Sequence, residues 1–400
     1  MKYLRLFILL LIFCNLPGYC LVNVSANTGA LLSYTTFLLI AIYYIINQKE
    51  PPIIPFIIFG FSFFLVSILV NADHADTFLV LFIKYFLVII MGAVLLKHSN
   101  KIELFAMLLF GAASIIFEAV FLKGTSGRFS GFYLNANPAG FACILGYALS
   151  ITMEDKRIKM LGQLVFTVAG FATFSRTFLL IWVLINICSL LISFKNIYSI
   201  FAGLILFSLF LSLETKTDLD TKRVGAFSAL LEGKVDDDLT KEPRTETWAV
   251  YYDKILNNPI FGNGYHAFSG EVYGNDSKSY TIHNGVHNTF LMVLGEAGFF
   301  IFLFFCWIYG YLLFIGVKMF KVDPQVFLIS FSMILYMLTN HNYFENYVEL
   351  FVSMYLYIKI KSWKEKNSDV TQINLLNYKR INPRANLNLR TLLKHKVLSR

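Results

Sequence analysis

Charged residues are scarce in this 400-residue chain. Asp, Glu, Lys and Arg together make up only 15% of it, whereas a soluble domain of ordinary composition carries about 25%. Hydrophobic residues make up 57% and aromatic residues 17%, a balance that suits a lipid-facing protein with aromatic belts at the membrane interfaces. The composition therefore argues against a soluble enzyme.

Cysteine is also sparse, and its number is odd. The five cysteines all fall in or beside apolar segments, which favours neither a disulfide framework nor a zinc ribbon. We expect them to be small buried hydrophobic residues. The sequence also shows no repeat of fixed period.

Long apolar runs are abundant, and a helix needs about 20 such residues to cross a bilayer. The runs predict an all-α polytopic membrane protein with about 12 transmembrane helices within residues 1–361. The candidate spans cover residues 3–20, 30–46, 53–70, 78–96, 102–122, 137–152, 160–174, 177–194, 197–213, 289–317, 324–340 and 346–361.

The first span has two interpretations. Lys2 and Arg5 precede a short apolar run, which is typical of a signal peptide as well as of a membrane helix. A convincing small-x-small cleavage site does not follow, and a second span comes at once. We therefore expect the first span to be retained.

Lys and Arg should collect on the cytoplasmic side of the spans. With the N-terminus inside, one alternation places nearly all basic connections on that side and the acidic stretch 71–76 on the other. The pattern predicts a multi-pass membrane protein with both termini in the cytoplasm. The basic residues concerned are Lys2, Arg5, Lys49, Lys97, Lys101, Lys156, Arg157, Lys159, Lys195, Lys318 and Lys321.

Two long segments carry opposite charge. The large loop between spans nine and ten, residues 214–286, is predicted to be extracytoplasmic and partly helical, with a net charge of −4. The tail from Lys361 carries +8 of the chain's +9, and residues 362–400 are predicted to form a basic cytoplasmic tail. Anionic lipid headgroups attract such a tail with about 1 kcal/mol per basic residue. Without aromatic interleaving or a folded core, it does not favour nucleic acid binding.

Two arginines lie in predicted outer turns. Arg128 belongs to the connection 127–138, in which Asn137-Pro138 is typical of a helix start; this connection either re-enters the membrane or forms an active-site wall. Arg176 lies in the tight turn Ser175-Arg176-Thr177. It either extends to the interface or directs its planar fork of donors at a phosphate.

The large loop contains a predicted amphipathic helix that begins near Arg244, because its aromatic and aliphatic residues recur at helical spacing. The turn that follows, residues 258–266, contains Gly262-x-Gly264. This pair is weak support for a phosphate cradle, since neither a preceding strand nor a following Gly-Lys-Ser accompanies it. The acidic run 236–238 is expected to be a solvated turn rather than a metal site.

His283 and His287 stand at the junction of the loop with span ten, four residues apart like two zinc ligands on a helix. Asn284 replaces the Glu of a metalloprotease, and Gly285 weakens the helix, so zinc is disfavoured. His287 is either a general base, because neutral imidazole accepts a proton near neutral pH, or a helix cap with Asn288.

Together these motifs resemble the O-antigen ligase and polymerase family of bacterial membrane glycan transferases. The matching positions are Arg176 in a Ser-Arg turn; Arg244 before Trp248; Asn258, Pro259, Gly262 and Gly264; and His287, Asn288, Glu296 and Gly298. The resemblance covers residues 128–300. Ile301 stands where ligases carry Gly, Thr or Tyr, which slightly favours a polymerase.

The resemblance implies a protein of the bacterial inner (plasma) membrane whose active site faces the periplasm. It implies transfer of a glycan from an undecaprenyl diphosphate-linked donor to a sugar hydroxyl at this outer face, with no cofactor and no metal. It implies that Arg176 and Arg244 hold the diphosphate and that His287 accepts the acceptor's proton, with inversion at C1. Arg223, Arg128 and His283 are further candidates for holding glycan or phosphate. The acceptor is a lipid-linked repeat for a polymerase and the lipid A-core for a ligase.

Two alternatives of other classes are a flippase for lipid-linked oligosaccharides and a structural subunit of a polysaccharide assembly complex. A transporter typically has internal repeats and charges at the membrane midplane. Here the Arg and His candidates instead lie at one rim. Lys84 and Glu118 lie within apolar spans, where they either pair with each other or extend to the interface.

Overall fold

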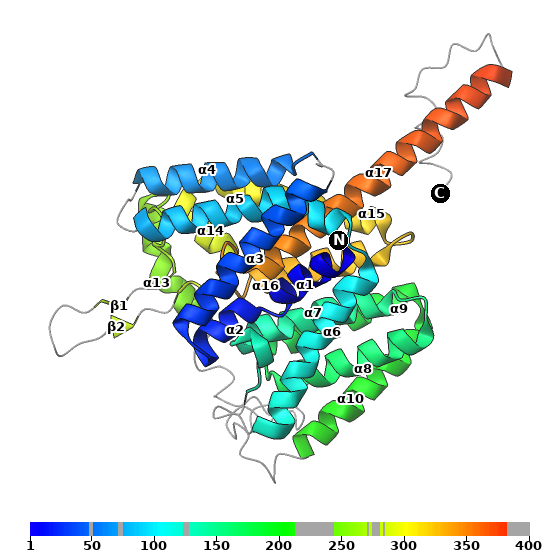
Figure 1. The fold of residues 1–400 in the computed structure, drawn as a ribbon, viewed down its shortest axis with the longest axis horizontal. Coiled ribbons are helices and arrows are strands. Elements are labelled where there is room, and N and C mark those ends of the chain that lie inside the picture. The colour runs from blue at the N-terminus through cyan, green and yellow to red at the C-terminus, as the bar shows by residue number, and fades with distance from the viewer. Residues whose placement is uncertain are drawn as a thin grey trace. The chain divides into compact units, whose positions relative to one another are not determined.

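The structure is a computed structural model that describes residues 1–47, 51–70, 75–122, 128–212, 244–269, 272–273, 281–282 and 285–381. Helices dominate these residues (Figure 1), which confirms the all-α class. The elements are α1 (Lys2–Phe13), α2 (Leu16–Asn23), α3 (Ala26–Ile46), α4 (Ile54–Val70), α5 (Ala75–Lys97), α6 (Lys101–Phe117), η1 (Glu118–Leu122), η2 (Gly131–Tyr133), α7 (Ala136–Ile151), α8 (Lys156–Ala172), α9 (Arg176–Ile192), η3 (Phe194–Asn196), α10 (Ile197–Ser212), α13 (Arg244–Asn257), β1 (Val272–Tyr273), β2 (Thr281–Ile282), α14 (Thr289–Ala297), α15 (Phe299–Met319), α16 (Pro324–Met337) and α17 (Tyr347–Ile381).

Four of the described helices are long and apolar enough to cross a membrane, and a bent pair makes a fifth. The four are Ala26–Ile46, Thr77–Lys97, Lys101–Leu122 and Phe299–Met319. Five further apolar helices are shorter, between 10 and 17 residues. By length and composition these helices are suited to a membrane, and the number of twelve spans stays a prediction.

Two predicted spans are not single helices. The first is broken into α1 and α2, which meet at 54°, because Asn15 has a left-handed backbone with φ of 48°. The tenth, residues 289–317, is broken into α14 and α15 at Gly298, where φ is +81°. Neither conformation continues a right-handed helix, so both single-helix predictions are wrong.

The chain divides into two units, Met1–Tyr357 and Ile358–Arg400. Helix α17 continues through Ile381, well past the predicted end of the last span at residue 361. Residues 382–400 of the predicted basic tail lie outside the described residues.

Helix α7 lies at the centre of one group of helices. It contacts α6, α8, α9 and α16, and nearly all of its side chains are buried. The ring of Phe141 stacks on that of Tyr336 in α16, with centroids 4.0 Å apart. In a second group, α4 packs against α5, α14 and α15, with α4 beside α5 in Figure 1.

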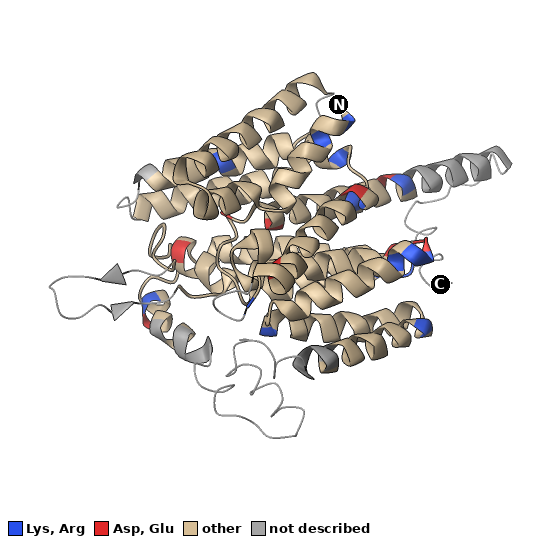
Figure 2. Cartoon of the chain, turned by 60° about the horizontal axis from the view of Figure 1, so that its bottom comes forward, with Lys and Arg blue, Asp and Glu red and all other residues tan. Residues whose placement is uncertain are grey.

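Charged residues occupy only short stretches of the helices (Figure 2). Contacts of such residues link helix ends that are predicted to be cytoplasmic. Arg5 in α1 pairs with Glu103 in α6, and Lys159 in α8 donates to the side chain of Asn196, at 2.9 Å. These contacts support the predicted alternation of the connections, while the side of the membrane stays a prediction.

Lys84 and Glu118 have separate neighbours. Lys84 lies over the ring of Phe37, 5.9 Å from its centroid. The carboxylate of Glu118 accepts hydrogen bonds from the backbone N–H groups of Ser130 and Gly131, at 2.8 and 2.6 Å. The predicted alternative that these two side chains pair with each other is therefore wrong.

Candidate functional site

A cavity of about 390 Å³ lies where the starts of α7 and α17 approach His287, two residues before α14. Polar side chains from four separate segments line it, and six of them are asparagines. We call this cavity the asparagine pocket. Its polar lining comprises Asn15, Tyr133, Asn135, Asn137, His287, Thr339, Asn340, His341, Asn342, Glu345, Asn346 and Tyr347.

His287 occupies the two-residue approach to α14 and is exposed within this pocket. The helix cap is its neighbour Asn288, whose side chain accepts from the N–H groups of Phe290 and Leu291, at 3.0 and 3.2 Å. Asn288 is only 4% exposed. The interpretation of His287 as the cap is therefore wrong, and its imidazole is not required for that structural role.

Backbone strain gathers around the same place. Five described residues other than glycine have a positive φ, and a bulky side chain rarely adopts this conformation outside constrained sites. Three of the five line the asparagine pocket, and one, His266, lines the adjacent cavity. The five are Asn15, Leu134, Phe174, His266 and His287.

His341 is a pocket residue that the sequence analysis missed. Its ring lies against that of His287, with centroids 4.6 Å apart and an interplanar angle of 75°. Burial, reinforced by the nearby His287 and His266, lowers the pKa of His341 to about 4, against the opposing effect of the Ser269 backbone. His341 is therefore neutral at pH 7. The available signal was the polar run Asn340-His341-Asn342 between two apolar spans.

A buried carboxylate fixes the segment that carries His341. Glu349 in α17 is fully buried and accepts hydrogen bonds from Asn340 Nδ2 and Asn346 Nδ2, at 2.7 and 2.8 Å. The hydroxyl of Thr289 donates to the carbonyl oxygen of Asn340, at 2.7 Å. Hydrogen bonds thus hold Asn340 and Asn346, at the two ends of the segment, to α17. Asn340 is also hydrogen-bonded to the start of α14, two residues after His287.

The structure brings Arg128 and Arg176 to one turn between α8 and α9. Arg128 Nε donates to the carbonyl oxygen of Thr173, at 3.4 Å. Ser175 caps α9, and the exposed Arg176 is the first residue of that helix. We call Arg128 with residues 173–176 the arginine turn.

A hydrogen bond joins the arginine turn to the asparagine pocket. Ser175 Oγ donates to Asn137 Oδ1, at 2.9 Å, and Asn137 lines the pocket together with His287. The predicted start of a helix at Asn137-Pro138 is confirmed, since α7 begins at Ala136 with Asn135 as its cap. The 127–138 connection therefore contributes to the wall of the pocket.

The other predicted site residues are less completely placed. Arg244 is the first residue of α13, which confirms the predicted helix, but its side chain lies outside what the structure describes. Arg223, His283 and the acidic run 236–238 lie outside the described residues.

The Asn258–Gly264 motif forms an interlock with the end of α14. The N–H groups of Asn263 and Gly264 donate to the carbonyl oxygens of Gly295 and Glu296, at 2.7 and 3.1 Å. Phe299 N–H donates in turn to the carbonyl oxygen of Pro259, at 2.9 Å. Because the turn's N–H groups are already donated within the protein, the phosphate-cradle interpretation is wrong.

The buried side chain of Glu296 adds a further hydrogen bond to this interlock. It is only 2% exposed, and its Oε1 accepts from the N–H of Phe268, at 3.2 Å. Glu296 also lines a second cavity of about 270 Å³ with His266, His341 and Glu345. The family glutamate thus positions the 265–269 segment, which packs beside His341.

Residues 161–306 match the family model described as O-antigen ligase. The matched residues make up less than half of the chain, and over them the chain is similar to this family. The match runs from α8 into α15 and includes Arg176 and His287, so the resemblance to the O-antigen ligase and polymerase family is confirmed. Comparison with curated proteins and with solved structures gave no match. Asn137 and the segment 339–346 lie outside the matched region.

Proposed function

We propose that this protein is an O-antigen or surface polysaccharide polymerase. It moves a glycan from undecaprenyl diphosphate to a hydroxyl of a second lipid-linked repeat, at the periplasmic face of the inner membrane. The observation that carries the proposal is the position of His287. Its side chain is exposed in a polar pocket, and Asn137 in the wall of that pocket is hydrogen-bonded to the arginine turn. The similarity of residues 161–306 to the O-antigen ligase family supports the reaction class, which is transfer of a glycan.

The reaction needs two functions from the protein. The acceptor hydroxyl oxygen forms a bond to C1 of the donor sugar, while the bond from C1 to the diphosphate oxygen breaks and the leaving diphosphate keeps the electron pair. Arg176 and Arg128 neutralise the charge that develops on the diphosphate, with Arg244 and Arg223 as further candidates from the large loop. His287 takes the acceptor's proton.

This single displacement inverts the configuration at C1. The leaving group is already activated as a diphosphate, so the proposal requires neither a metal nor another cofactor. His283 remains a candidate for holding glycan. Other polysaccharide assembly proteins are proposed partners of this protein, because they supply and consume lipid-linked glycan.

The second candidate is an O-antigen ligase, whose acceptor is the lipid A-core. It is favoured by the description of the matching family model, whereas Ile301 favours the polymerase. A flippase is the alternative of another class. A flippase needs no proton acceptor. Transport also does not require a strained His287 in a pocket beside two arginines.

Purified protein supplied with lipid-linked glycan alone tests the proposal. We expect a ladder of lipid-linked oligomers whose new linkage is inverted, and a 10²- to 10⁴-fold lower rate in H287A. A product that appears only when lipid A-core is added would identify a ligase. Undiminished transfer by H287A, with the protein present at normal levels, would contradict the mechanism.

A further inference from the structure

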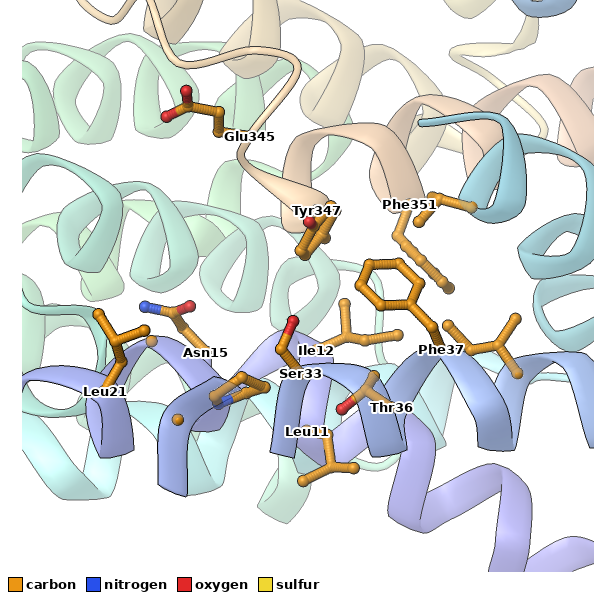
Figure 3. A pocket seen from close by; sticks show the side chains of 15 residues that line it. Leu11, Ile12, Asn15, Leu21, Ser33, Thr36, Phe37, Glu345, Tyr347 and Phe351 are labelled. Atoms are coloured by element: carbon orange, nitrogen blue, oxygen red, sulfur yellow. The ribbon is translucent and has the colours of Figure 1, made fainter. Parts of the chain in front are cut away.

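Three cavities meet at one carboxylate. Glu345 lines the asparagine pocket, the 270 Å³ cavity that contains His266, and a third cavity of about 220 Å³ between α1, α3 and the start of α17. Figure 3 shows this third cavity, with Glu345 on one side and the rings of Phe37 and Phe351 away from it. Glu345 is exposed, so its carboxylate faces the space that a ligand of these cavities occupies.

Cations are missing from the same walls. None of the described residues that line the three cavities is Lys or Arg. His341, the imidazole between two of the cavities, is neutral at pH 7 because burial lowers its pKa to about 4. A diphosphate needs positive charge around it, so this lining is unsuited to the diphosphate and suited to a different part of the substrates.

Amide groups dominate the polar surface instead. Asn137 uses its carbonyl oxygen to accept from Ser175, which leaves its NH₂ group to donate. Asn340 donates its NH₂ to Glu349, which leaves its carbonyl oxygen to accept. A sugar hydroxyl both donates and accepts a hydrogen bond, and asparagine side chains supply both partners without net charge.

The carboxylate adds a charge preference to this neutral surface. The effect of Glu345 reaches the neighbouring cavity, since burial and then Glu345 raise the pKa of Tyr265. Because none of the described lining residues is Lys or Arg, which could balance its charge, this carboxylate repels an anionic ligand and attracts a cationic one.

We infer that the asparagine pocket is the acceptor-sugar subsite, and that Glu345 restricts the acceptor to neutral or amine-bearing sugars and rejects hexuronic acids. This inference deepens the proposed function and rests on it. The diphosphate of the donor then lies on the arginine turn, and the acceptor hydroxyl lies between Asn137 and His287.

Competition with defined disaccharides tests the charge preference. The probes are one disaccharide and its analogues in which the terminal hexose is a hexosamine or a hexuronic acid, used as inhibitors of transfer by the full-length protein in nanodiscs. For the wild type we expect the hexuronic acid to bind at least about tenfold more weakly than the neutral sugar. In E345Q the two should bind within about threefold of each other, and in E345K the order should reverse.

E154Q is the matched control, because Glu154 is an exposed carboxylate outside all three cavities. It should keep the wild-type preference, and none of these variants should change the affinity for undecaprenyl diphosphate. Equal inhibition of the wild type by neutral and anionic sugars, inhibition by neither, or an unchanged preference in E345Q would each overturn the inference.

Direct binding of the same disaccharides to H287A separates this inference from the proposed function. The charge preference should persist in H287A, where no transfer is expected. If the wild type transfers no glycan but H287A discriminates between the sugars, the proposed function fails and the subsite stands. If the wild type transfers glycan and no variant changes the preference, only the subsite fails.

Discussion

The arginine turn and the asparagine pocket adjoin each other but use opposite chemistry. The turn presents Arg128 and Arg176, whereas the described lining of the pocket has amides, imidazoles and one carboxylate, and neither Lys nor Arg. One hydrogen bond, from Ser175 to Asn137, connects them. On the proposed function, this difference implies that the two parts of the reaction are recognised separately, the diphosphate by charge and the sugar by neutral hydrogen bonds.

Removal of the charge from the arginine turn should have the largest effect. We expect R176A to lower kcat/KM for the lipid-linked donor roughly 100-fold, and R176K to recover only part of it, because Lys lacks the planar fork of donors. R157A is the control, since Arg157 is exposed at the other end of α8. Equal losses of kcat/KM in R176A and R157A would contradict a specific role of the arginine turn in binding the donor.

Removal of the buried carboxylate beside the asparagine pocket should lower stability and weaken binding of the acceptor, and it should leave binding of the donor diphosphate unchanged. E349A leaves the amides of Asn340 and Asn346 without their buried partner, so we expect the free energy of unfolding to fall by ~2–4 kcal/mol. The thermal midpoint in detergent measures this loss. The affinity for the neutral disaccharide should fall while the affinity for undecaprenyl diphosphate stays constant. A change confined to undecaprenyl diphosphate would contradict the assignment of the two regions.

The interlock behind His287 gives a matched pair of glycines. At Gly298, φ is +81° and a Cβ would collide with the backbone of Ile260 and Phe261, whereas a Cβ at Gly310 meets nothing within 4 Å. G298A should therefore lower the free energy of unfolding by about 1–3 kcal/mol, and G310A should leave it unchanged or raise it slightly. Similar midpoints for the two variants would show that the interlock is not needed.

The smallest expected effect is a pH dependence within the pocket. The pKa of His341 is about 4 in the folded protein and about 6.5 in an unfolded chain, so the unfolded state binds the proton more readily. Stability should fall on the order of 1–2 kcal/mol between pH 7 and pH 5 from this group and be flat above pH 7. H341Q should remove this component of the thermal midpoint's pH dependence. An unchanged profile would mean that His341 is not buried as described.

Much of this architecture could be predicted from the sequence. The apolar runs predicted helices that the structure has, and the spacing after Arg244 predicted α13. Short motifs singled out Arg176 and His287 as candidate site residues. These features are local, because each depends on residues within one helix or one turn.

The asparagine pocket could not be predicted in the same way. Asn15, Asn137, His287 and Asn346 are far apart in the sequence, and only the packing of α1, α7, α14 and α17 brings them together. Hydropathy also does not reveal the breaks at Asn15 and Gly298, because the residues on both sides are equally apolar while the break depends on one positive φ.

Binding of undecaprenyl diphosphate without a glycan, which carries no acceptor sugar, to H287A and to R176A in nanodiscs tests the separation of the two regions most directly. The account predicts that H287A binds it within about threefold of the wild type, whereas R176A binds it at least about tenfold more weakly. Equal loss of affinity in both variants would contradict it, because His287 would then hold the diphosphate rather than activate the acceptor.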